Sequence, residues 1–487
     1  RMGGSVMHAI PDQAVTRLEH DLIGERAVPA SAYYGIHTLR ALENFPITGT
    51  PISIYPDLIK ALARIKQAAA MTNHELGLLD AVRCEAICKA CEEIGTGLWH
   101  DQFVVDVIQG GAGTSTNMNA NEVIANRALE LLGHHRGDYA HLHPNEHVNI
   151  SQSTNDVYPT ALKIAAIFGI ETLIEAMAVL RNAFAEKADA FASILKMGRT
   201  QLQDAVPMTL GQEFQTYAVM LGEDEERLRE AAHLICEINL GATAIGTGIT
   251  AHPDYAARVC THLCTLTQLP LITAPNLIEA TQDCGAFVQL SGVLKRVAVK
   301  LSKTCNDLRL LSSGPRAGLG EINLPAMQAG SSIMPGKVNP VIPEVVNQIA
   351  FEVIGNDLTV SFAAEAGQLQ LNAFEPIIAH SLFKSVTHLR QGCLILAERC
   401  VKGITANAER LRHSVTSSIG LVTALNPYIG YQNATALAQE ALRTGASVYD
   451  LVIEKKLLEQ HELDAILNPH VLTAPHPLIK LSKVPRP

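Results

Sequence analysis

The chain has 487 residues, of which 47% are hydrophobic and 18% are charged, and its formal net charge at pH 7 is −10. A chain of this length buries a large core and is expected to divide into more than one structural unit. The acidic balance argues against nucleic acid or an anionic membrane as a partner, because both favour a basic surface. It permits a small anionic substrate held by a local cluster of donors.

No segment has the pattern of a membrane span. The most apolar long segment, residues 157–180, contains Lys163, Glu171 and Glu175, and charges at the centre of a bilayer are costly. The opening residues RMGGSVMHAI lack the basic-then-apolar pattern of a secretory signal. We therefore expect a cytoplasmic protein that does not interact with membranes.

The N-terminal third of the sequence is mainly helical in pattern. Residues 25–50 give the only hint of short strands. Two segments with apolar residues at helical spacing follow, at 56–77 and 79–99, and the first opens with Pro56 and Asp57, as helices often do. Both segments are predicted to form helices.

Ten cysteines are too few for a disulfide framework in a chain of this size. Cys84, Cys88 and Cys91 recur at helical spacing, and so do Cys260 and Cys264. One helix face could present such thiols to a metal. The alternative, buried reduced cysteines that pack as small apolar residues, is favoured by the burial tendency of free cysteine.

Longer helical patterns dominate the rest of the chain. They cover residues 156–193, 208–240 and 283–313, and a further helical region, 342–402, holds two segments at 343–367 and 376–400. Typical helices have about 11–12 residues, and helices of about 30 residues cannot bury their apolar stripes in a small domain. The pattern predicts a helix bundle completed by other subunits. After residue 407 it shortens, and residues 426–469 are predicted to form two or three short helices.

Four loops rich in small polar residues interrupt the helical background. Three of them lead directly into a helical pattern, and Thr154 or Asn155 is the expected N-cap of the helix that contains Pro159. Helix N-termini offer unpaired N–H groups to anions, and hydroxyl and amide side chains add neutral donors. The loops are GGAGTSTNMN (110–119), NISQSTND (149–156), GRTQLQDAVP (198–207) and GSSIMPGKVNP (330–340).

Any one of these loops alone is most simply a cap or a turn. Four in one chain, two of them carrying Arg199 or Lys337, favour a small ligand with more than one negative charge. A nucleotide-binding loop at 110–119 is disfavoured, because the segment follows no strand pattern and lacks a GK[ST] ending.

A histidine-rich segment lies between residues 133 and 147. Its histidines could bind zinc, but their spacing fits no strong zinc pattern. Gly137 and Pro144 instead favour an irregular surface loop. The histidines are His134, His135, His141, His143 and His147.

The segment GSSIMPGKVNP resembles the signature of the fumarase/aspartase superfamily, and the resemblance extends over nearly the whole chain. Within this superfamily the sequence is most similar to the aspartate ammonia-lyases. The segments that carry the resemblance include VPASAYYGIHTLRALENF, QGGAGTSTNMNANEV, HPNEHVNISQSTNDVYPT, MGRTQLQDAVPMTLGQEF, GATAIGTG, SSGPRAGLGEINLP and AEAGQLQLNAFEP.

The resemblance implies a mainly α fold of three domains, with the long central helices of four subunits joined in one bundle. The implied domains are an N-terminal domain (1–150), a central bundle domain (151–406) and a small C-terminal helical domain (407–487). It implies a homotetramer whose active sites use loops from three subunits. The implied reaction is the reversible deamination of L-aspartate to fumarate and ammonia, without an organic cofactor or a metal.

The resemblance also assigns residues. It implies Ser331 as the base, with Lys337 and Asn339 binding the carboxylate that takes up charge. The loop around them closes over substrate in the family. The substrate's other groups would be held by Thr114, Ser153, Thr154, Asn155, Thr200, Gln201 and Ser332.

These residue types suit the implied chemistry. Removal of a proton next to a carboxylate produces an aci-carboxylate, and fixed donors aimed at its charge are each worth about 10²–10³ in rate. A serine takes up the proton only as an alkoxide, which requires a dry, electropositive pocket that lowers its pKa. Lys337, Asn339 and a closing loop are expected to supply that environment.

Gln201 helps to choose among relatives. Fumarases usually have GRTH where this chain has GRTQ, and expulsion of hydroxide needs an acid, whereas the ammonium group already carries its proton. Aspartases occur with either residue. Fumarate hydratase therefore stays as an alternative, as does a non-catalytic structural relative. Argininosuccinate and adenylosuccinate lyases fit less well, since they lack the AYYG and EINLP segments.

Overall fold

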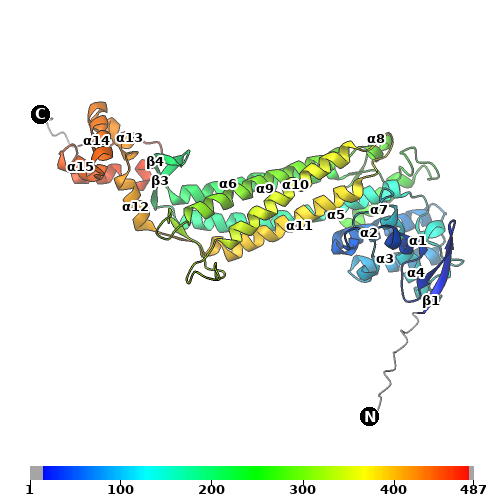
Figure 1. Ribbon diagram of the computed structural model, residues 1–487. Coiled ribbons are helices and arrows are strands. Elements are labelled where there is room, and N and C mark those ends of the chain that lie inside the picture. Colours follow the sequence, from blue (N-terminus) through cyan, green and yellow to red (C-terminus); the bar gives the residue numbers. More distant parts are fainter. Residues whose placement is uncertain (1–14, 482–487) are drawn as a thin grey trace, which may run out of the picture. The chain divides into compact units, whose positions relative to one another are not determined.

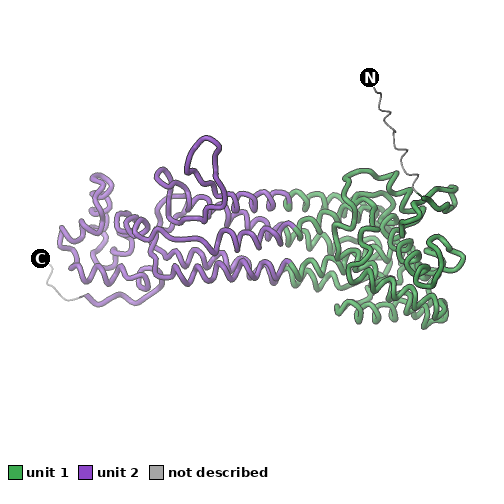
Figure 2. The backbone as a smooth tube through the Cα atoms, turned by 90° about the horizontal axis from the view of Figure 1, so that it is seen from below, with its two compact units in different colours: residues 1–172, 228–294, 353–387 green, residues 173–227, 295–352, 388–487 purple. Residues whose placement is uncertain are grey.

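The computed structural model describes residues 15–481 and is mainly α-helical, as the sequence predicts (Figure 1). The chain divides into two compact units (Figure 2). Unit 1 contains the residues as far as Thr172 together with Leu228–Leu294 and Val353–Thr387. Unit 2 contains Leu173–Arg227, Lys295–Glu352 and the residues from His388 onward. The division into three domains stays a prediction.

Unit 1 begins with a hairpin of β1 (Thr16–Asp21) and β2 (Gly24–Pro29), which pair antiparallel with Thr16 opposite Pro29. The hint of short strands within 25–50 is confirmed by β2, although β1 lies before that range. The chain after β2 forms helix α1 (Ile36–Asn44).

Four helices build the rest of the N-terminal part of unit 1. They are α2 (Pro56–Glu75), α3 (Ala81–Gly95), α4 (Thr114–Leu131) and, later in the chain, α7 (Tyr255–Thr267). Helix α2 packs against both α3 and α7, and α3 packs against α4. Pro56 occupies the first turn of α2, as predicted, and α2 is buried on several faces.

Five long helices each contribute residues to both units. They are α5 (Thr154–Ala190), α6 (Leu210–Ile235), α9 (Gly285–Leu311), α10 (Val341–Glu365) and α11 (Glu375–Arg399). The first three lie within a few residues of the predicted ranges. The fourth region contains two helices, as its two predicted segments indicate. The Asn372 side chain, between them, donates hydrogen bonds to Ala363 O and Ala364 O at the end of α10. Those bonds satisfy carbonyls that α10 leaves unpaired.

Within unit 2, charged side chains join the long helices to one another. Asp224 on α6 accepts hydrogen bonds from Arg296 Nε at 2.6 Å and Lys300 Nζ at 3.0 Å, both on α9. Arg181 on α5 pairs with Glu225 on α6 at 2.7 Å. Asp224 and Glu225 are buried. These pairs fix α6 against its neighbours, since a buried carboxylate without its cation is costly.

As far as residue 481, the C-terminal part of unit 2 contains six short helices. Residues 426–469, where two or three were predicted, hold three whole helices and the end of a fourth. The apolar core of this C-terminal part includes Leu421, Leu425 and Leu463, which are fully buried. A hairpin of β3 (Leu195–Thr200) and β4 (Gln203–Thr209) packs against the first two of the six helices. The helices are α12 (Ala408–Ser417), α13 (Leu421–Ile429), α14 (Tyr431–Thr444), α15 (Val448–Glu454), α16 (Gln460–Ile466) and α17 (Pro469–Leu472).

The remaining elements are short. The strands are β5 (Glu237–Ile238), which pairs in parallel with β6 (Ile272–Thr273), and β7 (Ile322–Asn323), which pairs antiparallel with β8 (Thr405–Ala406). The helical turns are Ile52–Ile54, His100–Gln102, Pro144–Val148 and Val401–Gly403, and α8 spans Leu277–Gln282. Between residues 15 and 481, no helix combines the length and apolar character needed to cross a membrane.

Candidate active site

The start of α5 is fixed by a reciprocal pair of hydrogen bonds. Ser153 Oγ accepts from the backbone N–H of Asn155, and Asp156 Oδ1 accepts from the N–H of Ser153 at 2.9 Å. The arrangement is close to a capping box with an aspartate in the acidic position, but Ser153 Oγ accepts from the second helical residue, not the third. The N-cap is therefore Ser153, and the prediction of Thr154 or Asn155 is wrong by one or two positions. Thr154 and Asn155 lie in the first turn and are half-buried.

Asp156 also holds a second loop against α5. Its other carboxylate oxygen accepts from the N–H groups of Gly241 at 2.9 Å and Thr243 at 3.3 Å. Nearby, Asn155 Nδ2 donates to Ala244 O at 2.7 Å. Asp156 is fully buried, and burial raises its pKa to about 6. The GATAIGTG segment thus supports the first turn of α5.

The start of α4 lies beside the first turn of α5. Gly113 precedes Thr114 with φ of 94°, and a Cβ on Gly113 would lie 2.2 Å from the Tyr158 ring, so only glycine permits this approach. Asn117 Nδ2 on α4 donates to Thr154 Oγ1 at 3.2 Å. Unit 1 therefore brings together four predicted residues, which we term the hydroxyl–amide cluster: Thr114, Ser153, Thr154 and Asn155.

Two helix N-termini meet at the hydroxyl–amide cluster, those of α4 and α5. Some first-turn N–H groups are already bonded, Asn155 N to Ser153 Oγ and Thr116 N to Gln109 Oε1, but each N-terminus still carries a partial positive charge. Together with the hydroxyl and amide side chains, they form a neutral but donor-rich surface. Such a surface suits a carboxylate.

In unit 2, Thr200 and Gln201 lie at the tip of the β3–β4 hairpin. Thr200 pairs with Gln203, and the two turn residues Gln201 and Leu202 have φ of 53° and 61°. Two consecutive left-handed residues define a type I′ turn, whose twist matches that of the strands. The tip residues are exposed, so both predicted side chains are accessible to a ligand.

A network of ion pairs fixes strand β3 of this hairpin. Lys196 Nζ lies 2.8 Å from a carboxylate oxygen of Glu213 on α6 and 2.8 Å from one of Glu321. The second oxygen of Glu321 pairs with Arg199 Nη2 at 2.5 Å. The Lys196 side chain is only 1% exposed. Glu321 therefore fixes both cations of β3, one of them immediately before Thr200.

The signature loop, Gly330–Pro340, is closed at its base by hydrogen bonds within itself. Gly330 N donates to Lys337 O at 2.8 Å, and Asn339 Nδ2 donates to Gly330 O at 2.9 Å. Ser331 Oγ accepts from two backbone N–H groups, those of Ile333 at 3.2 Å and Met334 at 3.0 Å. Ser332 and Lys337 are exposed. The loop thus has an ordered base and an open tip.

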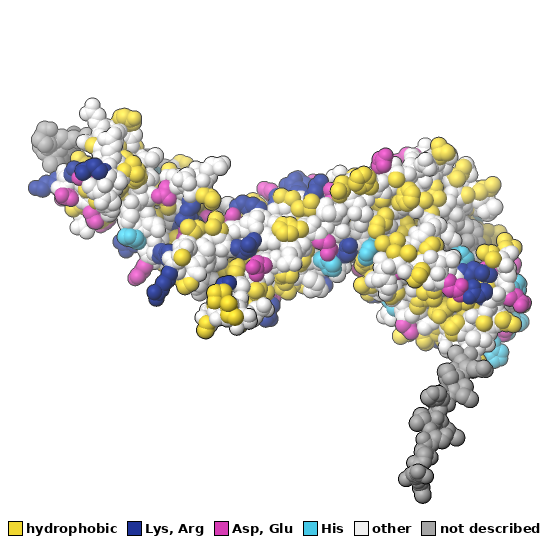
Figure 3. Space-filling model, viewed as in Figure 1, with side chains coloured by type: hydrophobic (Ala, Val, Ile, Leu, Met, Phe, Trp, Pro, Cys, Tyr) yellow, Lys and Arg dark blue, Asp and Glu magenta, His cyan; other side chains and the backbone are white. Residues whose placement is uncertain are grey.

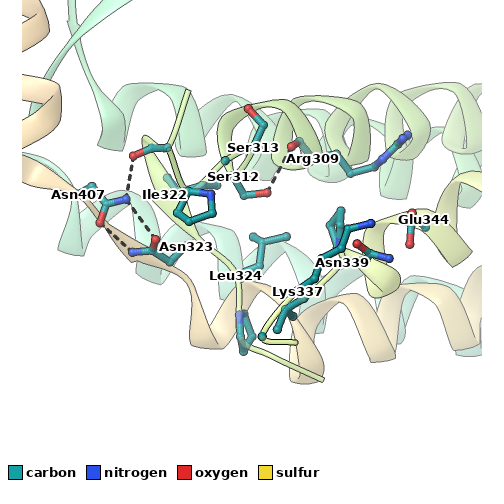
Figure 4. Close-up of a pocket in the computed structure, with 17 residues that line it drawn as sticks. Arg309, Ser312, Ser313, Ile322, Asn323, Leu324, Lys337, Asn339, Glu344 and Asn407 are labelled. Carbon is teal, nitrogen blue, oxygen red and sulfur yellow. Dashed lines mark hydrogen bonds between the residues drawn. The ribbon is translucent and has the colours of Figure 1, made fainter. Parts of the chain in front are cut away.

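A pocket of about 560 Å³ lies beside this loop, wholly within unit 2 (Figure 4). Lys337 and Asn339 line it from the loop, and Arg309 and Ser312 line it from the end of α9 and the turn that follows. Two cations and two neutral donors suit an anion with at least one carboxylate. Glu344, at the start of α10, is the acidic residue of the lining.

The structure places the predicted residues in two sets. The hydroxyl–amide cluster lies in unit 1, whereas the hairpin tip and the signature loop lie in unit 2. Sequence reasoning missed several supporting residues: Lys66, Asn117, Asp156, Arg309 and Glu321. The acid three residues after Ser153 was the available signal for Asp156, whereas Lys66 had none, because a lysine in a helical pattern normally faces solvent.

The favoured prediction for the cysteines of α3 is confirmed: they are free thiols, with Cys84 and Cys91 buried and Cys88 half-buried. Cys84, Cys88 and Cys91 lie on α3, and His134 stacks on His141 with ring centroids 3.8 Å apart. His143 Nδ1 accepts from the N–H groups of the next helical turn. Across residues 15–481, no group of three or more His, Cys, Asp or Glu side chains is arranged to hold a metal ion.

Comparison with known proteins identifies the family. The lyase family model matches residues 24–355, and the model of the fumarase C C-terminus matches residues 421–474. The aspartate ammonia-lyase of Helicobacter pylori is 59% identical over 460 residues, which cover 94% of this chain and 98% of the relative.

Two solved structures are also similar. The fumarate lyase:delta crystallin of Brucella melitensis has a TM-score of 0.92 and 55% identity and covers 95% of this chain and 100% of its own. The class II fumarase of Schistosoma mansoni has a TM-score of 0.89 and covers the same shares, but is only 36% identical. The identity to the Helicobacter pylori ammonia-lyase, 59%, exceeds the 36% identity to the fumarase, which favours the ammonia-lyases over the fumarases. The chain therefore belongs to the aspartate ammonia-lyase family, within the lyases that also include the fumarases.

Proposed function

We propose that the protein catalyses the reversible deamination of L-aspartate to fumarate and ammonia, by a base-catalysed anti elimination through an aci-carboxylate. It is a carbon–nitrogen lyase by family, and the relatives named above give the substrate. The observation that carries the proposed mechanism is the pocket beside the signature loop. There Lys337 and Asn339 face a cavity that Arg309 also lines.

In this proposal neutral donors bind the substrate in its ground state, and the signature loop binds the carboxylate that gains charge during the reaction. The hydroxyl–amide cluster, Thr200 and Ser332 hold the ground-state carboxylate and the amino group. Lys337 and Asn339 bind the carboxylate that gains charge as the proton leaves. Donors of this kind stabilise the transition state more than the substrate, because the charge that they face is created by the reaction.

Ser331 removes the proton in this proposal. Its Oγ already accepts two backbone N–H bonds, and donors to an oxygen stabilise its ionised form. Ser331 is half-buried, and the loop tip around it is exposed. Closure of the loop over substrate would exclude water and strengthen the interaction of the alkoxide with Lys337.

Gln201 fits the departure of ammonia. The ammonium group carries its own proton, so the leaving group needs no acid, and an amide at the hairpin tip can hydrogen-bond the amino group without titrating. The reaction as proposed uses no organic cofactor and no metal.

We further propose a homotetramer in which each active site combines loops of three subunits. An apolar stripe on α10 supports an interface: Ile354, Leu358 and Phe362 recur at four-residue spacing and are 38%, 59% and 67% exposed. Other apolar side chains are also visible at the surface in Figure 3. Assembly would join the hydroxyl–amide cluster of one subunit to the signature loop of another.

Release of fumarate, followed by its ultraviolet absorbance, tests the activity. L-Aspartate should be a much better substrate than L-malate. The reverse order would show a fumarate hydratase, and absence of fumarate from both would show a non-catalytic relative. For the mechanism, Ser331→Ala should abolish turnover but still bind succinate, a dicarboxylate without a leaving group. Near-normal turnover of this variant would remove Ser331 from the role of base.

A further inference from the structure

A lysine lies completely buried behind the hydroxyl–amide cluster. Lys66 on α2 has no exposed surface, and its Nζ donates to three side-chain oxygens. These are Asn117 Oδ1 at 2.7 Å, Gln152 Oε1 at 2.8 Å and Asn149 Oδ1 at 3.1 Å. An ammonium group has three N–H donors, so each is used.

The three acceptors are amides, and the cation fixes their orientation. The oxygen of each amide faces Lys66, so its NH₂ group must face away. Gln152 Nε2 accordingly donates to Val148 O and Ile150 O, both at 3.0 Å. Asn117 Nδ2 donates to Thr154 Oγ1 at 3.2 Å and to Asn149 Oδ1 at 3.3 Å. A rotated Asn117 amide would lose the cation and place its NH₂ against it.

This orientation has a consequence for the hydroxyl of Thr154. Its oxygen accepts a bond from Asn117, which leaves its single O–H available to donate elsewhere. A hydroxyl that donates is attractive to a carboxylate. If the Asn117 amide were reversed, Thr154 would donate to it and would turn oxygen lone pairs toward the anion.

We propose that Lys66 is a positioning residue of the active site: its ammonium group fixes the Asn117 amide, which keeps the Thr154 hydroxyl as a hydrogen-bond donor to a carboxylate of the substrate. The inference rests on the proposed function, in which Thr154 binds that carboxylate. Lys66 does not touch the substrate, and it acts through a chain of two hydrogen bonds.

A buried lysine is costly, which indicates that the fold retains it for more than packing. Burial lowers the pKa of Lys66 to about 7, and the nearby Asp156 carboxylate opposes that shift. An apolar side chain of similar length would avoid the cost of burying a charge. It would leave the three amides without the group that orients them.

The test is a double-mutant cycle with succinate as the ligand. Lys66→Met and Thr154→Val are measured singly and together, and binding is followed by calorimetry or as inhibition. One hydrogen bond to a charged group is worth about tenfold or more in affinity. We expect Lys66→Met to weaken succinate about tenfold in the natural background and less than about twofold when Thr154 is already valine.

Two controls separate this role from a general loss of structure. Lys163→Met removes another largely buried lysine of unit 1, which donates to Glu237 O at 2.6 Å, and should leave succinate affinity within about twofold. If Lys66→Met does not fold, Asn117→Leu replaces it in the cycle, because it removes the same amide and adds no charge.

Each outcome has one meaning. Equal losses from Lys66→Met in both backgrounds would overturn the inference, since the cation would then act on the ligand by its charge alone. An unchanged affinity for succinate in Lys66→Met or Asn117→Leu would also overturn it. If Thr154→Val alone has no effect, the proposed substrate site itself fails.

Discussion

The buried acid Glu375 should make the free energy of unfolding depend on pH. It lies in the first turn of α11 and is 4% exposed. Burial raises its pKa from 4.5 to about 8, and the positive charge of Lys163 opposes the shift. At neutral pH the folded chain therefore holds this carboxyl largely protonated, whereas the unfolded chain exposes it to water and ionises it.

The magnitude follows from the two pKa values. Their difference is about 3.5 (8 − 4.5), and one pKa unit corresponds to about 1.4 kcal/mol, so the full effect is of the order of 5 kcal/mol. Because the folded pKa is the higher one, the contribution to stability is complete below pH 4.5. It declines as the pH rises and is lost above about pH 8. Between pH 5 and 7.5 the decline should be about 3 kcal/mol.

Urea unfolding at fixed protein concentration, from pH 5 to pH 8, measures this decline against Glu375→Gln. Asp156 and Glu122 have pKa values raised by burial to about 6 and about 7, so they also titrate in this window. Both proteins contain them, and the difference between the two pH profiles reports Glu375 alone. Glu375→Gln should lose clearly less stability with rising pH. Two parallel profiles would refute the reasoning.

Three further outcomes are expected. Lys337→Ala should lower kcat about 10²–10³-fold and raise KM for L-aspartate, and unchanged steady-state kinetics would contradict its charge-stabilising role. Glu321→Gln leaves Lys196 and Arg199 with one anion fewer, so it should destabilise the chain by about 3 kcal/mol in urea unfolding. Because Arg199 directly precedes Thr200, it should also raise KM for L-aspartate. A normal KM in the destabilised protein would show that Glu321 does not position Thr200. Leu358→Asp on the apolar stripe should reduce the assembly to smaller species by light scattering, and an unchanged mass would move the interface elsewhere.

The helical periodicity predicted the long helices to within a few residues. It could not predict the exact ends, which depend on tertiary contacts. Residues 156–193 became α5 (Thr154–Ala190) because a 3.6-residue pattern is a local property. The break between α10 and α11 falls between the two predicted segments, but the contact that fixes it was not predictable: the Asn372 amide reaches back to carbonyls eight and nine residues earlier. Ser153, Thr154 and Asn155 are all good capping residues. Only the bond to Asp156 distinguishes the first of them.

The candidate site shows a similar limit. The motif residues could be assigned by resemblance, whereas Lys66 could not, because a lysine in an alanine-rich helix normally faces solvent. Its acceptors lie 51 to 86 residues away in the sequence. Arg309 was equally hidden, since only folding brings the end of α9 to the pocket that Lys337 lines. Such contacts depend on packing between distant segments, which spacing does not encode.

The exposure of the signature loop has a practical consequence. Lys337 is followed by Val338, and both are exposed, so the bond between them is a natural target for trypsin while the loop is open. A ligand that closes the loop would shield this bond. The rate of cleavage there would then report loop closure directly, without a chromophore or a label, even in a variant that no longer turns over substrate.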